Sequence, residues 1–139
     1  MLSKPYSLMI VDDQPEICEM IEFIVEHKFP GVFNIVATKD SEESMAQIKS
    51  KNFQVIITDL IIPKQSGYDV ARVALEKNPG TQVIYLTGDV SFDVALTCYT
   101  EGAASIMFKP VEPKTVTQLL SMCLRRLDHW DSVFSKGDE

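Results

Sequence analysis

The sequence lacks the features that mark several common functional classes. Its three cysteines, Cys18, Cys98 and Cys123, are widely separated and have no metal-ligand spacing. Each lies in a helical apolar pattern, so we expect buried thiols in a reducing cytoplasm. Lysine and arginine number 13 against 20 aspartates and glutamates, so no basic excess is available for nucleic acid. No apolar run is long enough to span a membrane or to form a signal-peptide core. These absences favour a cytoplasmic protein.

Nucleotide-binding glycine patterns and histidine clusters are also missing. Neither G-x-G-x-x-G nor a P-loop follows the first apolar segment, which argues against dinucleotide or flavin binding. The two histidines, His27 and His129, have no partners in pattern, so neither is expected to bind a metal or to donate phosphate. With 139 residues, 45% of them apolar, the chain is long enough for one domain with a hydrophobic core.

The most informative stretch is 55–67, VIITDLIIPKQSG. Its first three residues are β-branched, as in a strand that is buried on both faces of a parallel sheet. Asp59 ends that strand with a carboxylate, at the position where open α/β sheets bind ligands. Pro63 disfavours a regular helix directly after it. Gly67 is expected to adopt a backbone conformation that other residues avoid.

Apolar segments and helical patterns alternate along the whole chain. Strands are predicted at 7–11, 32–37, 55–59, 82–86 and 104–108, the second of them at an edge of the sheet. A helix is predicted after each strand, beginning near residues 15, 40, 66, 91 and 113. Apolar stripes are predicted at Ile17, Met20, Ile21, Ile24 and Val25 in the first helix, and at Phe92, Ala95, Leu96 and Tyr99 in the fourth. This alternation predicts an α/β fold with right-handed crossovers and helices on both faces of a parallel sheet.

The last helix sets the expected domain boundary. Its leucine stripe is predicted to belong to the core rather than to a dimer seam, although Trp130 extends the stripe beyond the expected edge of the domain. We therefore expect one domain over 1–130. Residues 131–139 are polar and are expected to form a frayed tail or the start of a linker.

Polar residues follow four of the five predicted strands. They are Asp12-Asp13, Asp59, Thr87 and Lys109. Because parallel strands point the same way, these side chains are expected to meet at one edge of the sheet. Three carboxylates about 5 Å apart would repel by roughly 3 kcal/mol per pair at an effective dielectric near 20. The cluster therefore needs a cation, proton uptake or an opening to solvent, and oxygen ligands favour Mg²⁺.

The ordered set resembles the receiver domain of two-component response regulators. The matching pattern is DD after strand one, D-L-x-x-P-x-x-x-G after strand three, T-G after strand four and K-P after strand five. Each piece is weak alone, but the set at these intervals is highly specific. The resemblance covers about residues 7–127. It implies a flavodoxin-like (βα)5 fold, similar to the chemotaxis regulators, with strand order 2-1-3-4-5.

The resemblance also implies a phosphorylation site. Asp59 would be the phosphorylated aspartate. Asp12 and Asp13 would hold Mg²⁺ or Mn²⁺ together with Asp59, and the backbone carbonyl of Ile61 would be a further ligand. The Thr87 hydroxyl would bond the incoming phosphoryl group. Phosphoryl transfer depends mostly on positioning and charge neutralisation, which a divalent cation would favour.

Four further residues have expected roles in the same family pattern. Lys109 would pair with Asp59 or its phosphate, and the Lys109–Pro110 bond would be cis and aim the ammonium inward. Ile106 departs from the pattern, because receivers usually carry Tyr or Phe there and that ring reports the threonine's movement. Ile61 and Asp89 flank the site where the family tunes phosphate lifetime. We expect Asp89 to influence the attacking water and Ile61 to shield the phosphate.

The leading prediction is a phosphorylation-dependent signalling switch. A histidine kinase or a phosphotransfer protein would phosphorylate Asp59, and the chain would catalyse only its own phosphorylation and slow dephosphorylation. The signal would shift the fourth helix and fifth strand and alter a partner-binding surface. The output would be a downstream protein or a C-terminal output domain outside this sequence. A homodimer through the fourth helix, fifth strand and last helix is a further expectation.

Two other functions remain open at this stage. The first is a protein-binding module of the same fold that has abandoned phosphorylation, which Ile106 leaves possible although the complete acidic set argues against it. The second is a phosphohydrolase with an aspartyl-phosphate intermediate. Such enzymes usually place another aspartate two residues after the nucleophile, and here that residue is Ile61.

Overall fold

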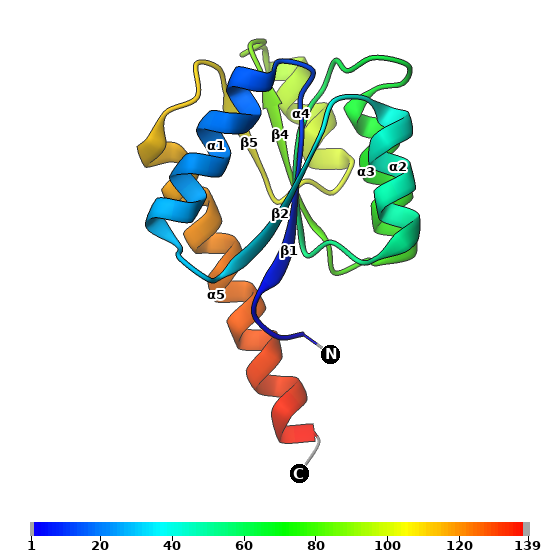
Figure 1. The fold of residues 1–139 in the computed structure, drawn as a ribbon. Coiled ribbons are helices and arrows are strands. Elements are labelled where there is room, and N and C mark those ends of the chain that lie inside the picture. Colours follow the sequence, from blue (N-terminus) through cyan, green and yellow to red (C-terminus); the bar gives the residue numbers. More distant parts are fainter. Residues whose placement is uncertain (1, 138–139) are drawn as a thin grey trace.

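Five parallel strands form one sheet in the order β2-β1-β3-β4-β5, which confirms the predicted topology. The computed structural model describes residues 2–137, and strands and helices alternate throughout (Figure 1). The strands are β1 (Tyr6–Val11), β2 (Phe33–Thr38), β3 (Val55–Asp59), β4 (Gln82–Thr87) and β5 (Ser105–Phe108). The helices are α1 (Pro15–Lys28), α2 (Ser41–Ser50), α3 (Gly67–Lys77), α4 (Phe92–Thr100) and α5 (Pro113–Gly137).

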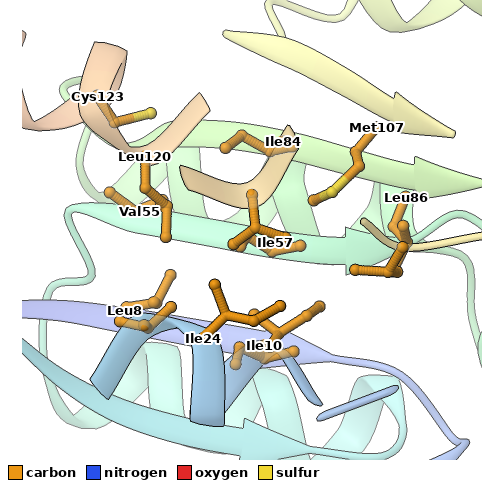
Figure 2. Close-up of a cluster of buried hydrophobic side chains, with 14 of the residues drawn as sticks. Leu8, Ile10, Ile24, Val55, Ile57, Ile84, Leu86, Met107, Leu120 and Cys123 are labelled. Carbon is orange, nitrogen blue, oxygen red and sulfur yellow. The ribbon is translucent and has the colours of Figure 1, made fainter. Parts of the chain in front are cut away.

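The helices cover both faces of the sheet. Helices α1 and α5 pack together on one face, whereas α2, α3 and α4 lie on the other (Figure 1). Side chains alternate along β3 as the pleat requires. Val55 and Ile57 face the α1–α5 layer, and Ile56 faces α2 and α3. Figure 2 shows the α1–α5 side, where Ile24, Leu120 and Ile57 belong to one hydrophobic cluster. The central strand is therefore buried on both faces, as its β-branched run predicted.

The strand and helix predictions hold to within a few residues, except at the last helix. β2 lies at the edge of the sheet, as expected. The three cysteines are buried and unpaired, as predicted. Met20 is 41% exposed, so its place in the inward stripe of α1 was wrong. Cys18 takes the buried position instead.

The predicted apolar face of α4 is wrong. Phe92 and Tyr99 are 76% and 78% exposed, and Leu96 is also exposed. The one fully buried residue of this helix is Cys98, which packs with β4 and α3 beside the half-buried Val94. Val94 and Cys98 form a second stripe with helical spacing. Because both stripes satisfy the same period, the sequence does not distinguish which one faces the sheet.

Helix α5 is longer than predicted. It continues to Gly137, where the polar composition had indicated a frayed tail from residue 131. Its first half packs on the sheet, and its second half projects past the amino ends of the strands (Figure 1). Residues 138 and 139 of the predicted tail lie outside the described part of the chain. Within residues 2–137, no helix is both long and apolar enough to cross a membrane.

Candidate functional site

The predicted polar residues lie where four strands end. Asp12 follows β1, Asp59 ends β3, Thr87 ends β4 and Lys109 follows β5. The register sets Asp59 beside Leu86, one residue before Thr87. All four positions are therefore at the carboxyl edge of the sheet, which is the edge that open α/β folds use for ligands.

Asp59 is held by one contact to each oxygen of its carboxylate. Its Oδ2 atom lies 2.6 Å from the Lys109 ammonium, and its Oδ1 atom accepts a hydrogen bond of 3.0 Å from the backbone N–H of Ile61. The residue is only 8% exposed. A charge-assisted bond of this length fixes the direction of the carboxylate. Asp59 is thus oriented by its own loop and by β5.

Asp12 is the most buried charged group of the site. Its Oδ1 atom accepts a hydrogen bond from the backbone N–H of Gln14. Its Oδ2 atom is 3.3 Å from the ammonium of Lys109, without hydrogen-bond geometry. Among residues 2–137, this oxygen is the only buried side-chain nitrogen or oxygen that lacks a hydrogen bond. Burial raises the pKa of Asp12, and the nearby Asp59 adds to the rise, while the Gln14 bond and Lys109 oppose it.

Lys109 bridges the two aspartates. Burial by itself would lower its pKa, but the hydrogen bond and charge of Asp59, with the charge of Asp12, raise the pKa overall. The predicted cis bond between Lys109 and Pro110 is confirmed. The backbone N–H of Lys109 donates to the carbonyl of Thr87 at 2.8 Å, which ties the end of β5 to the end of β4. The ammonium therefore stands between Asp12 and Asp59.

The expected cluster of three carboxylates does not assemble. In the part of the chain that the structure describes, no three Asp, Glu, His or Cys side chains lie close enough together to hold a metal ion. Asp12 and Asp59 meet at Lys109, whereas Asp13 is exposed to solvent. Lys109 supplies a positive charge beside both carboxylates, and its contact with Asp59 is the pair that the family pattern predicted.

Three more predicted site residues lie around this centre. The Thr87 hydroxyl accepts a hydrogen bond from the backbone N–H of Asp89 at 3.0 Å. Asp89 is exposed, and hydrogen bonds from Ser91 lower its pKa. The side chain of Ile61 is 85% exposed, while its backbone N–H bonds to Asp59. Thr87 and Asp89 thus belong to one hydrogen-bonded loop, and Ile61 stands at the mouth of the site.

Gly67 is needed for a different reason from the one expected. Its φ is not positive; the only non-glycine residue in 2–137 with a positive φ is Lys64, at 79°. A Cβ atom on Gly67 would lie 2.1 Å from the backbone oxygen of Asp59. The start of α3 therefore packs directly against the end of β3, and only glycine fits between them.

Sequence reasoning missed the support beneath this loop. The Ser41 hydroxyl, at the start of α2, donates to the carbonyl of Pro63 and accepts from the backbone N–H of Gln65. Ser41 is 2% exposed. These bonds join α2 to the loop that follows Asp59. A buried serine at a helix start gives no sequence signal for a partner 22 residues away.

Ile106, which replaces the usual Tyr or Phe of the family, lies next to a pair of aromatic side chains, Tyr85 and Tyr68. Ile106 on β5 is paired in register with Tyr85 on β4. Tyr85 is 1% exposed, and its ring lies 5.1 Å from that of Tyr68 in α3. Burial raises the pKa of both phenols, that of Tyr68 to about 12. The space beside Ile106 on β5 is therefore filled by Tyr85, on the neighbouring strand β4.

The fold and this edge define an α/β protein with a buried Asp–Lys–Asp group at the carboxyl ends of a parallel sheet. The family model described as the response regulator receiver domain matches residues 8–121. The chain belongs to this family, and with it to two-component signal transduction.

Curated relatives and solved structures agree with this assignment. The probable transcriptional regulatory protein TcrX of Mycobacterium tuberculosis is 28% identical over 88% of this chain and 51% of its own length. The response regulator protein PilR of Pseudomonas aeruginosa is 28% identical over 84% of this chain and 26% of its own length. A response regulator receiver domain protein from Clostridium thermocellum has a TM-score of 0.79 at 26% identity, covering 90% of this chain and 98% of that one. The chain thus spans about half, or less, of these two curated relatives.

Proposed function

We propose that this chain is a phosphorylation-dependent switch in which Asp59 accepts the phosphoryl group. The observation that carries the proposal is the contact between the Asp59 carboxylate and the Lys109 ammonium at the carboxyl edge of the sheet. A carboxylate oxygen of Asp59 attacks phosphorus in a phosphohistidine, the new O–P bond forms and the P–N bond breaks. The released imidazole takes up a proton. Lys109 offsets the charge that accumulates on the phosphoryl oxygens.

The acidic residues fit a divalent cation in donor type. The Oδ2 atom of Asp12 is a buried oxygen without a hydrogen bond, and Lys109 is the cation that lies next to it. Burial raises the pKa of Asp12, and a cation beside this oxygen would oppose that rise. Asp12, Asp13, Asp59 and the Ile61 carbonyl would hold Mg²⁺ or Mn²⁺, and Asp13 would have to turn in from solvent for the set to close around the ion. The ion, when bound, neutralises charge on the phosphoryl group. Lys109 contacts both Asp12 and Asp59 and orients the Asp59 carboxylate.

Phosphate on Asp59 would act on the neighbouring strand ends. Thr87 follows Leu86, the register partner of Asp59, and the carbonyl of Thr87 accepts the backbone N–H of Lys109. New bonds from the phosphate to Thr87 and Lys109 therefore pull on β4 and β5 together. Taking a switch from 1:99 to 99:1 needs about 5.5 kcal/mol of differential stabilisation, which several charge-assisted bonds supply.

The proposed partners follow from the family. Receiver domains take phosphate from histidine kinases or phosphotransfer proteins, and we propose the same source here. The regulators of transcription among the relatives support an output through a further domain or a downstream protein. The chain turns over no external substrate in this proposal. A location in the cytoplasm and the homodimer through α4, β5 and α5 stay predictions.

The test is phosphorylation by acetyl phosphate in the presence of Mg²⁺, read by intact mass. We expect one phosphoryl adduct in the wild type and none in Asp59→Asn. Asp93→Asn, an exposed aspartate in the first turn of α4, is the matched control and should be modified like the wild type. A wild-type chain that stays unmodified under these conditions would refute the proposal.

The competing function is a binding module that does not use phosphate. Ile106 and the buried Tyr85 favour it, because the usual aromatic reporter is replaced. A chain that binds its partner equally well as wild type, Asp59→Asn and phosphorylated wild type would support this module. A change of at least tenfold in affinity on phosphorylation would support the switch.

A further inference from the structure

The apolar stripe of α5 continues beyond the domain. Its buried members are Val116, Leu120, Cys123 and Leu127, at alternating spacings of four and three residues. The same spacing leads to Trp130 and Phe134, which are 43% and 44% exposed. A repeat of this kind is the pattern by which helices pair. We call residues 129–137 the α5 extension, about 14 Å of helix.

A groove lies between the α5 extension and the amino-end loops of the sheet. Its volume is about 430 Å³, enough for aromatic side chains. The lining residues that matter here are Gly80, Arg126, Leu127, Trp130 and Phe134. The Trp130 and Phe134 rings lie 5.8 Å apart along one wall. This groove is at the pole opposite Asp59, so the phosphorylation site does not account for it.

We propose that the α5 extension of a second copy of this chain, running antiparallel, occupies the groove. A parallel partner is excluded, because Leu127 on the same stripe packs in the core with the sheet, which would collide with a second helix that ran in parallel. In the antiparallel arrangement Trp130 of one copy packs on Phe134 of the other. Each helix tip then reaches the loop at Gly80 in the other copy, and the contact closes with two-fold symmetry.

The positive charge of Arg126 at the groove favours the carboxyl end of an incoming helix. Arg126 borders the groove, and in residues 2–137 no carboxylate lies within ion-pair distance of it. The carboxyl end of an incoming helix carries a partial negative charge and free carbonyls, which suit a guanidinium. The aromatic surface still exposed on each extension is roughly 200 Å², given 150–250 Å² for each aromatic side chain. The dimer is therefore weak and depends on concentration.

Trp130 is the only tryptophan, so its fluorescence reports this contact directly. The 139-residue chain is measured from low micromolar to millimolar concentration by sedimentation velocity and by fluorescence. We expect a monomer–dimer equilibrium, with the emission of Trp130 moving to shorter wavelength over the same concentration range. A monomer at every concentration, or a dimer without a change in Trp130, would overturn the proposal.

Matched variants locate the interface. Phe134→Asp places a charge on the stripe and should raise the dissociation constant at least tenfold. Ser132→Asp introduces the same charge on the opposite face of the helix, two residues from both Trp130 and Phe134, and should leave the constant within twofold. Leu96→Asp on α4 tests the other exposed apolar face. If Leu96→Asp dissolves the dimer and Phe134→Asp does not, the interface lies on α4 and this proposal is wrong.

Cross-linking tests the direction of the two helices. Gly80→Cys and Gly137→Cys are made in separate chains, and neither glycine would place a Cβ within 3.4 Å of another residue. The native cysteines are buried. When the two variants are mixed and oxidised, we expect disulfide-linked heterodimers. Linked Gly137→Cys homodimers in place of heterodimers would indicate parallel helices and contradict the arrangement.

Discussion

Asp12 concentrates the electrostatic cost of the site in one side chain. It is 1% exposed, its Oδ2 atom lacks a hydrogen bond, and burial raises its pKa. The Lys109 ammonium, at 3.3 Å, compensates only in part. A carboxyl group that is harder to ionise in the folded state binds more protons there than in the unfolded chain. Its contribution to stability therefore falls as the pH rises from its ordinary pKa of 3.8 toward the raised value.

Asp12→Asn should stabilise the fold at neutral pH. Asparagine keeps an oxygen for the Gln14 N–H and removes the buried charge, so we expect a gain of about 1 kcal/mol in the free energy of unfolding. The gain should shrink as the pH falls below about 4, where the wild-type carboxyl is protonated in both states. Urea unfolding in the presence of a chelator, from pH 3 to 8, measures the difference between the two chains. A difference that does not vary with pH would contradict the burial argument.

Gly67→Ala should destabilise the fold far more than an ordinary loop substitution. The added Cβ would meet the Asp59 carbonyl at 2.1 Å, so β3 and α3 must move apart. We expect a loss of about 1–3 kcal/mol in the free energy of unfolding. Gly88→Ala is the control, because its Cβ would contact nothing within 4 Å. Equal effects of the two substitutions on urea unfolding would show that the strand and helix are not in tight contact.

The lifetime of the phosphorylated state should depend on Asp89 and Ile61. Asp89 is exposed and lies on the Thr87 loop, and the side chain of Ile61 is at the mouth of the site. We expect Asp89→Ala to slow dephosphorylation and Ile61→Asn to accelerate it, each severalfold, because one loses a group beside the attacking water and the other loses an apolar shield. Loss of the adduct over time, followed by mass, measures both rates. Unchanged half-lives in both variants would discard this idea.

Helix α4 is an element whose buried face was predicted wrongly from the spacing of its apolar residues. Two stripes with the same spacing lie on it, and the larger side chains, Phe92 and Tyr99, face solvent. The small Cys98 faces β4, where Tyr68 and Tyr85 already fill the space. The bulk of the neighbours decided which stripe is buried. This left an apolar surface on α4 that is available to a partner.

The same substitution at two tyrosines, one buried and one exposed, tests which side chains around α4 belong to the core. Tyr85→Ala should cost about 3–5 kcal/mol in the free energy of unfolding, because a ring that is 1% exposed leaves a cavity. Tyr99→Ala should change it by less than about 0.5 kcal/mol, since that ring is 78% exposed. Urea denaturation of both variants provides the comparison. A large loss for Tyr99→Ala would mean that its ring packs on another element.

Element boundaries show how far local signals reach. Helix α1 begins at Pro15, as the helix signals predicted, because caps and breakers act within a few residues. The end of α5 was predicted too early, because the polar residues after Trp130 are compatible with both a tail and an exposed helix. Only Gly137, beyond those residues, carries a stop signal. Local composition therefore located the start of α5 better than its end.

At the scale of the whole molecule, the two poles of the sheet have different chemistry. The carboxyl pole gathers Asp12, Asp59 and Lys109, and the amino pole holds the apolar groove beside the α5 extension. The sheet separates them by the length of its strands. A phosphoryl group on Asp59, as proposed above, would act on the rest of the molecule through β4, β5 and the helices packed on them.

Divalent cations should stabilise the whole fold. A ligand that binds only the folded state adds about 2.7 kcal/mol at a concentration of one hundred times its dissociation constant. We expect Mg²⁺ to raise the melting temperature of the wild type and of Asp93→Asn, and to leave that of Asp12→Asn nearly unchanged. Differential scanning calorimetry with and without Mg²⁺ tests this. An equal shift in all three chains would indicate binding elsewhere.

The sequence by itself determined the alternation of strands and helices, the strand order implied by the family pattern, and the residues that would stand at the carboxyl edge. These follow from local periodicity and from parallel strands that all point one way. The tertiary structure decided what required long-range contacts: Lys109 between Asp12 and Asp59, the exclusion of a side chain at Gly67, and the outward face of α4. The physical reason is that burial and electrostatic pairing depend on neighbours that are remote in the chain, which no local pattern specifies.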